Sequence, residues 1–144
     1  MDDPSRMAAV APEQDLPSRQ RRAFAVARDA AAKVLKRRFR LLALVRDAYA
    51  KLGRHEHALT RVQDDLRLLL RLARAWATRQ YRNVPWRSVL YAVAAIIYFV
   101  NPVDVIPDVL VGIGFVDDAA VVAAVVRAIR KDLEAFRDWE SPES

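Results

Sequence analysis

The sequence predicts an all-α fold, a small antiparallel bundle of about four helices. Residues 18–84 contain no proline and a single glycine, Gly53, so little interrupts helix formation there. Apolar residues recur at steps of three and four, and no segment shows the alternation of a strand. Two further apolar segments flank a turn rich in proline and glycine at residues 101–114. We therefore expect the last two helices to form an apolar hairpin around this turn.

The chain divides by composition into three regions. Residues 1–17 hold three of the seven prolines and are predicted to be a flexible tail. Residues 18–82 are predicted to form a basic amphipathic helical hairpin, and residues 85–140 an apolar helical hairpin. With 144 residues, 53% of them hydrophobic, the two hairpins are expected to share one modest core as a single folded unit.

The first hairpin is predicted from two periodic segments. One helix should run from about Ser18 to Leu52 and the next from about Leu59 to Tyr81, with the break at Gly53. Their cations fall mainly opposite the apolar stripes, and the run "KRRFR" places Phe39 among four of them. Such a face suits phosphates of lipid or nucleic acid, although a solvated arginine-rich surface is the alternative. The predicted basic surface consists of Lys36, Arg37, Arg40, Arg67, Arg71 and Arg74.

Charge is distributed unevenly along the chain. Residues 1–88 carry 20 Lys and Arg against 9 Asp and Glu, whereas residues 89–126 carry four aspartates and no cation. A basic half therefore leads into an apolar, acidic segment. A net charge of +6 suits an anionic partner such as a membrane surface.

The second hairpin begins with "VLYAVAAIIYFV", residues 89–100, which is apolar on every side. A helix of this kind is buried all round, in protein or in lipid. It is expected to begin at Pro85. Twelve residues span about 18 Å, which falls short of a bilayer core of roughly 30 Å. The final helix should start at Asp117 or Asp118 and end near Trp139.

The acidic turn has a structural interpretation. Asn101 and the prolines can start short helices, the glycines permit a chain reversal, and Asp117 or Asp118 can cap the last helix. Alternatively, Asp104 and Asp108, four residues apart, approach Asp117 and Asp118 across the turn. Clustered carboxylates in an apolar setting need a cation, an arginine such as Arg82 or Arg87, or protons.

Outside the acidic turn, the sequence offers few residues that could form a metal or catalytic site. There is no cysteine, and the two histidines, His55 and His57, are spaced so that a helix would point them to different faces. No base or nucleophile accompanies the aspartates, so no cofactor and no enzymatic activity are expected. A divalent cation such as Mg²⁺ or Ca²⁺ at the oxygen-only set Asp104, Asp108, Asp117 and Asp118 remains the alternative.

Residues 98–122, "YFVNPVDVIPDVLVGIGFVDDAAVV", closely resemble the signature of the YkvA-like family, a domain of unknown function (1232). The signature has an aromatic-rich apolar helix, a Pro-x-Asp-x-Ile-Pro-Asp turn, a Gly-x-Gly and an Asp-Asp pair before a second apolar helix. The resemblance implies a small helical, membrane-associated protein and no established reaction. The residues that carry this resemblance are Pro102, Asp104, Ile106, Pro107, Asp108, Gly112, Gly114, Asp117 and Asp118. Asn101, which can start a short helix, completes the signature turn.

Three hypotheses for function follow. The first is a non-enzymatic, membrane-associated protein with its apolar hairpin in or at the bilayer and a basic cytoplasmic helical pair. Cations flank the hairpin on both sides, which places both termini in the cytoplasm by the positive-inside rule. The second is a four-helix domain whose Asp-rich turn binds a divalent cation or a protein partner, with a homo-oligomer also open. A nucleic-acid-binding module ranks last because no recognised motif accompanies the charge.

Overall fold

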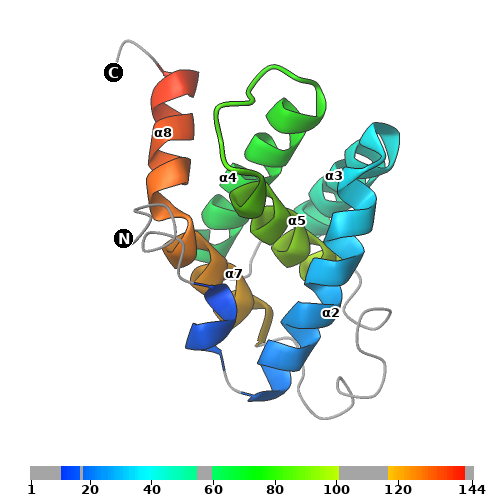
Figure 1. The fold of residues 1–144 in the computed structure, drawn as a ribbon, viewed down its shortest axis with the longest axis vertical. Helices are drawn as coiled ribbons and strands as arrows, with labels where there is room; N and C mark the ends of the chain where they lie inside the picture. The colour runs from blue at the N-terminus through cyan, green and yellow to red at the C-terminus, as the bar shows by residue number, and fades with distance from the viewer. Residues whose placement is uncertain (1–10, 17, 55–59, 101–116, 142–144) are drawn as a thin grey trace, which may run out of the picture.

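The computed structural model describes residues 11–16, 18–54, 60–100 and 117–141 (Figure 1). These residues form one short 3-10 helix and six α-helices, with no strand among them. The predicted all-α bundle is therefore confirmed. The elements are η1 (Pro12–Asp15), α2 (Ser18–Leu35), α3 (Arg38–Arg54), α4 (Thr60–Ala77), α5 (Trp86–Val100), α7 (Asp117–Ala128) and α8 (Arg130–Glu140).

The first long helix predicted from the sequence is broken in two. The N–H groups of Lys36 and Arg37 bond to carbonyls three residues back, at Lys33 and Val34, so the last turn of α2 tightens. The chain then changes direction, and α3 begins at Arg38. The single helix from Ser18 to Leu52 was wrong because α2 packs mainly against α5 while α3 packs mainly against α4.

The last helix is also broken. Ile129 separates α7 from α8 with backbone angles φ −114° and ψ 27°, which lie outside the helical range. Its side chain is buried in the core. The break lets α8 lie against α4, while α7 packs against both α4 and α5. The prediction of one continuous helix up to Trp139 was therefore wrong, because α7 and α8 pack on different surfaces.

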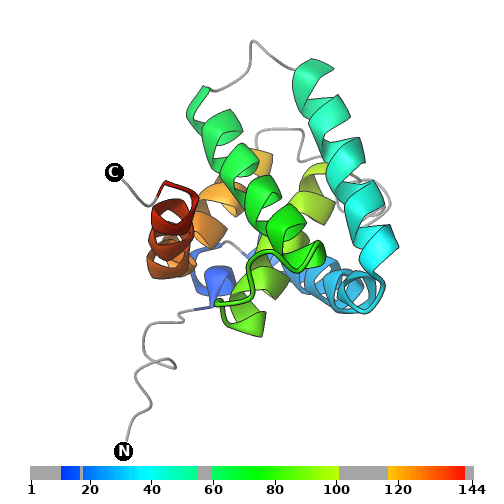
Figure 2. The same cartoon turned by 90° about the horizontal axis from the view of Figure 1, so that it is seen from above.

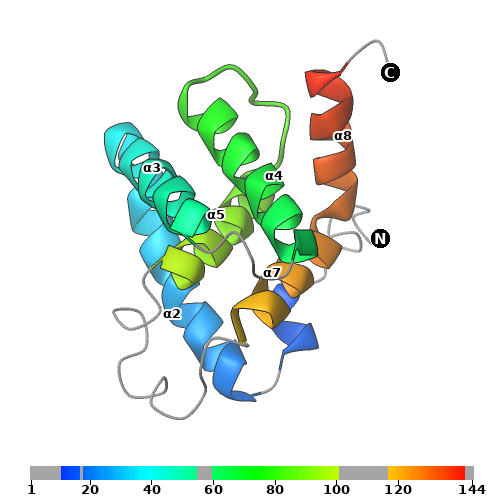
Figure 3. The same ribbon diagram turned by 180° about the vertical axis from the view of Figure 1, so that it is seen from behind.

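The apolar helix α5 lies at the centre of the bundle (Figure 3). It packs against α2, α3, α4 and α7, and all its residues from Ser88 to Tyr98 are buried. It begins one residue after the predicted Pro85, whose carbonyl accepts hydrogen bonds from the N–H groups of Ser88 and Val89. Protein therefore surrounds the helix that the sequence showed to be apolar on every side. The antiparallel neighbours α3 and α4 lie side by side, and both contact α5 (Figure 2).

Polar contacts fix both ends of α5. At its start, the Ser88 hydroxyl donates a hydrogen bond to the Asp132 carboxylate in the first turn of α8. At its end, the Lys51 ammonium of α3 donates to the Phe99 carbonyl and lies 4.9 Å from the centre of the Phe99 ring. A cation at a helix C-terminus is favourable, and α5 has no basic residue of its own in its last turn.

Replacing Ser88 by alanine should lower the free energy of unfolding by about 1–2 kcal/mol, because the partly buried Asp132 carboxylate loses a charge-assisted hydrogen bond. Urea unfolding of the wild type, Ser88→Ala, Asp132→Ala and the double variant would measure the coupling between the two side chains. If Asp132→Ala costs the same stability with or without the Ser88 hydroxyl, the contact does not stabilise the fold.

Candidate functional site

Most of the acidic signature lies outside the described residues. The signature residues outside these ranges are Asn101, Pro102, Asp104, Pro107, Asp108, Gly112 and Gly114. The two histidines, His55 and His57, also lie outside them. Asp117 and Asp118 occupy the first two positions of α7. Their capping role and the pairing of the aspartates with arginine or a cation remain predictions. Within the described ranges, no three His, Asp or Glu side chains are grouped so that they could hold a metal ion.

The predicted basic surface falls into two parts. On α4, Arg71 donates to the Glu140 carboxylate of α8 at 2.9 Å, so one of the three arginines predicted there is paired with an acid. The other three cations, Lys36, Arg37 and Arg40, are exposed where α2 turns into α3. No ion pair joins these three to another part of the chain that the structure describes. This corner therefore carries three exposed positive charges without an ion pair to another described part of the chain.

An aromatic ring projects from the same corner. Phe39 is 80% exposed and lies at the start of α3, between Arg38 and Arg40. The Arg38 guanidinium lies 5.7 Å from the centre of the Phe39 ring. The fold thus leaves a large apolar side chain in solvent with cations on both sides, and Phe39 takes no part in the core.

The connection between α4 and α5 brings further arginines and aromatic rings together. The helix α4 ends at Ala77, four residues before the predicted Tyr81, because the chain reverses there. The N–H of Gln80 bonds to the carbonyl of Ala75 and that of Arg79 to the carbonyl of Trp76, which is the Schellman pattern. Arg79 takes the left-handed position of this motif, with φ 64°, where glycine is usual.

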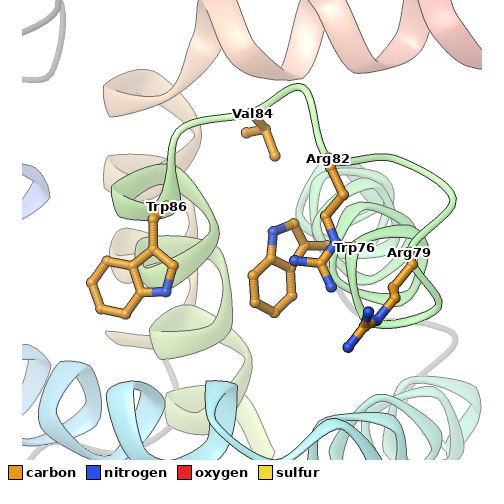
Figure 4. Close-up of a pocket in the computed structure, with 5 residues that line it drawn as sticks. All are labelled: Trp76, Arg79, Arg82, Val84 and Trp86. Carbon is orange, nitrogen blue, oxygen red and sulfur yellow. The ribbon is translucent and has the colours of Figure 1, made fainter.

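A shallow groove of about 540 Å³ opens beside this reversal (Figure 4). The guanidinium of Arg82 lies over the Trp76 ring, 4.2 Å from its centre. Trp86, which is 51% exposed, lies on the opposite side of the groove. No carboxylate is among the lining residues, which are Trp76, Arg79, Arg82, Val84 and Trp86.

The corner and the groove lie at the same end of the bundle (Figures 1 and 3). We call residues 36–40 together with residues 76–87 the basic aromatic end. The sequence has six arginines and no acid between Leu66 and Val103, so no carboxylate from this stretch offsets their charge. The basic aromatic end combines exposed cations with exposed aromatic rings, a combination suited to an anionic, partly apolar surface.

Two aromatic residues near the end of α4 have different environments. Trp76 lies in the groove, but Tyr81 is buried against Phe136 and Trp139, with ring centres 5.1 and 5.0 Å away. Burial, with a smaller effect from the Asp132 carboxylate, raises the pKa of the Tyr81 phenol above its ordinary 10.0. Tyr81 is therefore a neutral core residue near pH 7.

The groove itself was missed in the sequence. A signal was present in "WATRQYRNVPWR", residues 76–87, where three aromatic residues alternate with three arginines and no acid intervenes. Its assembly depends on the reversal at Arg79 and on the stacking of Arg82, which a linear pattern does not reveal.

Two comparisons with known proteins found a match. Residues 88–124 match the model of a family described as "Protein of unknown function (DUF1232)". The chain is 40% identical over 68 residues to the "Uncharacterized membrane protein YkvA" of Bacillus subtilis (strain 168), a match that spans 47% of this chain and 64% of that protein. No solved structure matches. None of the helices in the described ranges has both the length and the apolar character needed to cross a membrane. The resemblance seen in residues 98–122 is thus confirmed by the match of residues 88–124 to this family model.

Proposed function

We propose that this protein is a non-enzymatic, membrane-associated helical bundle that binds an anionic lipid surface through its basic aromatic end. The observation that carries the proposal is Phe39, 80% exposed within the cationic run at residues 36–40. Aromatic rings favour the boundary between headgroups and acyl chains. The membrane-protein name of the Bacillus subtilis relative supports the same association.

The packing of α5 favours association at the surface over insertion of the apolar hairpin. Ser88 to Tyr98 are all buried, and α5 contacts α2, α3, α4 and α7. Inserting α5 into lipid would require separating it from these helices and giving up their shared core. The basic aromatic end, in contrast, can reach a bilayer without any change in the fold.

The charge of the site also suggests a side of the membrane. The cytoplasmic leaflet carries anionic lipid, and each Lys or Arg near such a surface contributes about 1 kcal/mol to binding. A bundle held there by the basic aromatic end keeps both termini in the cytoplasm. Membrane lipid is then the main partner, and a protein partner or a second copy of the chain remains a prediction.

Vesicle sedimentation tests the proposal. The wild type should bind vesicles that contain phosphatidylserine and should bind phosphatidylcholine vesicles weakly, with an affinity that falls as salt rises. Replacing Arg37, Arg38 and Arg40 together by glutamate should weaken binding by about 100-fold or more, because three contributions of about 1 kcal/mol are lost.

A matched charge reversal provides the control. Arg22, Arg130 and Lys131 are exposed and lie outside the basic aromatic end, so replacing them by glutamate makes the same change in net charge. This control should retain most of the binding. Equal loss in both triple variants would show that net charge alone drives association, and a wild type that ignores phosphatidylserine vesicles would overturn the proposal.

A further inference from the structure

We infer that the groove beside the α4–α5 connection is a binding site for the phosphate headgroup of a single anionic phospholipid. The inference rests on the proposed function and deepens it. It distinguishes a site for one lipid molecule from the general electrostatic attraction between the corner at residues 36–40 and an anionic membrane. The groove is lined by two arginines, two tryptophans and a valine: Arg79, Arg82, Trp76, Trp86 and Val84.

The first argument is the backbone of Arg79. Its φ of 64° is the left-handed conformation that favours glycine, and a side chain with a β-carbon is strained there. The Schellman bonds that end α4 need only the backbone of this residue. The fold therefore gives no reason for an arginine at this position. Its guanidinium at the edge of the groove supplies one (Figure 4).

The second argument is the position of Arg82 over an aromatic ring. Its guanidinium lies over the Trp76 ring, 4.2 Å from the ring centre, and this cation–π contact holds the group beside the groove. A guanidinium is planar and carries its N–H donors along its edges, which is the geometry that binds two oxygens of a phosphate together. Within the described residues, neither Arg79 nor Arg82 is paired with a carboxylate. Two guanidinium groups that line one groove, with no carboxylate among the lining residues, are complementary to a phosphate.

The third argument is the apolar lining, which distinguishes a lipid from free phosphate. Trp86 is 51% exposed and lines the groove on the side opposite Trp76, and Val84 lies on the connecting loop above them (Figure 4). Tryptophan combines an apolar ring with one N–H donor and suits the boundary where a headgroup meets its chain. Inorganic phosphate would use the arginines alone, whereas a phospholipid would cover the rings as well.

Calorimetric titration with monomeric, short-chain lysophosphatidylglycerol tests the site without a membrane. Arg79→Gly and Arg82→Gln should each weaken binding by about 10-fold or more, because each removes charge-assisted hydrogen bonds to phosphate. Arg79→Gly also relieves the strained backbone, so its urea midpoint should equal or exceed that of the wild type. Loss of binding in this variant therefore cannot be a consequence of unfolding.

Two further ligands and one variant complete the experiment. Inorganic phosphate and a neutral monoacylglycerol of equal chain length should both bind much more weakly than the lysolipid. The corner variant with Arg37, Arg38 and Arg40 replaced by glutamate should lose vesicle binding yet keep the affinity for monomeric lysolipid. Unchanged lysolipid affinity in Arg79→Gly and Arg82→Gln, or equal affinity for monoacylglycerol, would overturn the groove as a phospholipid site. Neither result would contradict the proposed membrane binding by the corner at residues 36–40. Inorganic phosphate binding as tightly as the lysolipid would overturn a lipid ligand.

Discussion

Replacing Phe24 by alanine should lower the free energy of unfolding by about 3–5 kcal/mol, a large part of the stability of a domain of this size. Phe24 is fully buried on α2, and its ring lies 6.0 Å from that of Tyr91 on the central helix α5. Because α2 packs mainly on α5, the cavity would open at the main contact between the basic first part of the chain and its apolar second part. Urea unfolding followed by circular dichroism would measure the change.

Phe39 is the matched control for this substitution. It is the same residue type, 80% exposed, and Phe39→Ala should change the free energy of unfolding by no more than about 0.5 kcal/mol. The same variant should nevertheless bind phosphatidylserine vesicles more weakly than the wild type. If Phe24→Ala is as stable as Phe39→Ala, then α2 does not cover α5 in solution as it does in this fold.

Local sequence was enough to predict the class of fold and the position of its least ambiguous helices. The start of α4 differs by one residue from the predicted Leu59, and α5 begins one residue after Pro85. Both are set by short-range features, namely the helical period of apolar residues and a proline at the helix start. These features act within one or two turns and need no knowledge of neighbouring helices.

The two broken helices were not predictable in the same way. No proline or glycine marks the turn after Leu35 or the break at Ile129, and both breaks occur where the chain leaves one neighbouring helix for another. Tertiary packing overrides local propensity in such places. The candidate site, too, could be predicted only in part from local sequence. Phe39 and its cations were visible as a run, whereas the groove needs the φ of Arg79 and the stacking of Arg82 on Trp76.

The environment of α5 was the largest question that composition left open. A helix that is apolar on every side can be surrounded by protein or by lipid, and its sequence is the same in both cases. The structure surrounds α5 with α2, α3, α4 and α7. Residues 92–95 make this testable, because four consecutive helical residues point about 100° apart and together cover all sides of the helix.

Single cysteines at Ala92, Val93, Ala94 and Ala95 should each react with a maleimide about 1,000-fold more slowly than a cysteine at the exposed Ala50, in buffer without detergent. All four positions are 0% exposed, so reaction requires local opening, and an opening cost of about 4 kcal/mol corresponds to that factor. The natural chain has no cysteine, so each variant carries one thiol and needs no other change.

In denaturing urea the four buried thiols should react as fast as the Ala50→Cys control, which would show that the protection comes from the fold and not from the local sequence. Matching urea midpoints would establish that each variant keeps the native bundle. Fast labelling at one position alone would identify a side of α5 that protein does not cover, and that side would then be the place where lipid or a partner contacts the helix. Slow labelling at all four requires that protein cover every side of α5 without a membrane, and this in turn requires the membrane contact to be made by other parts of the bundle.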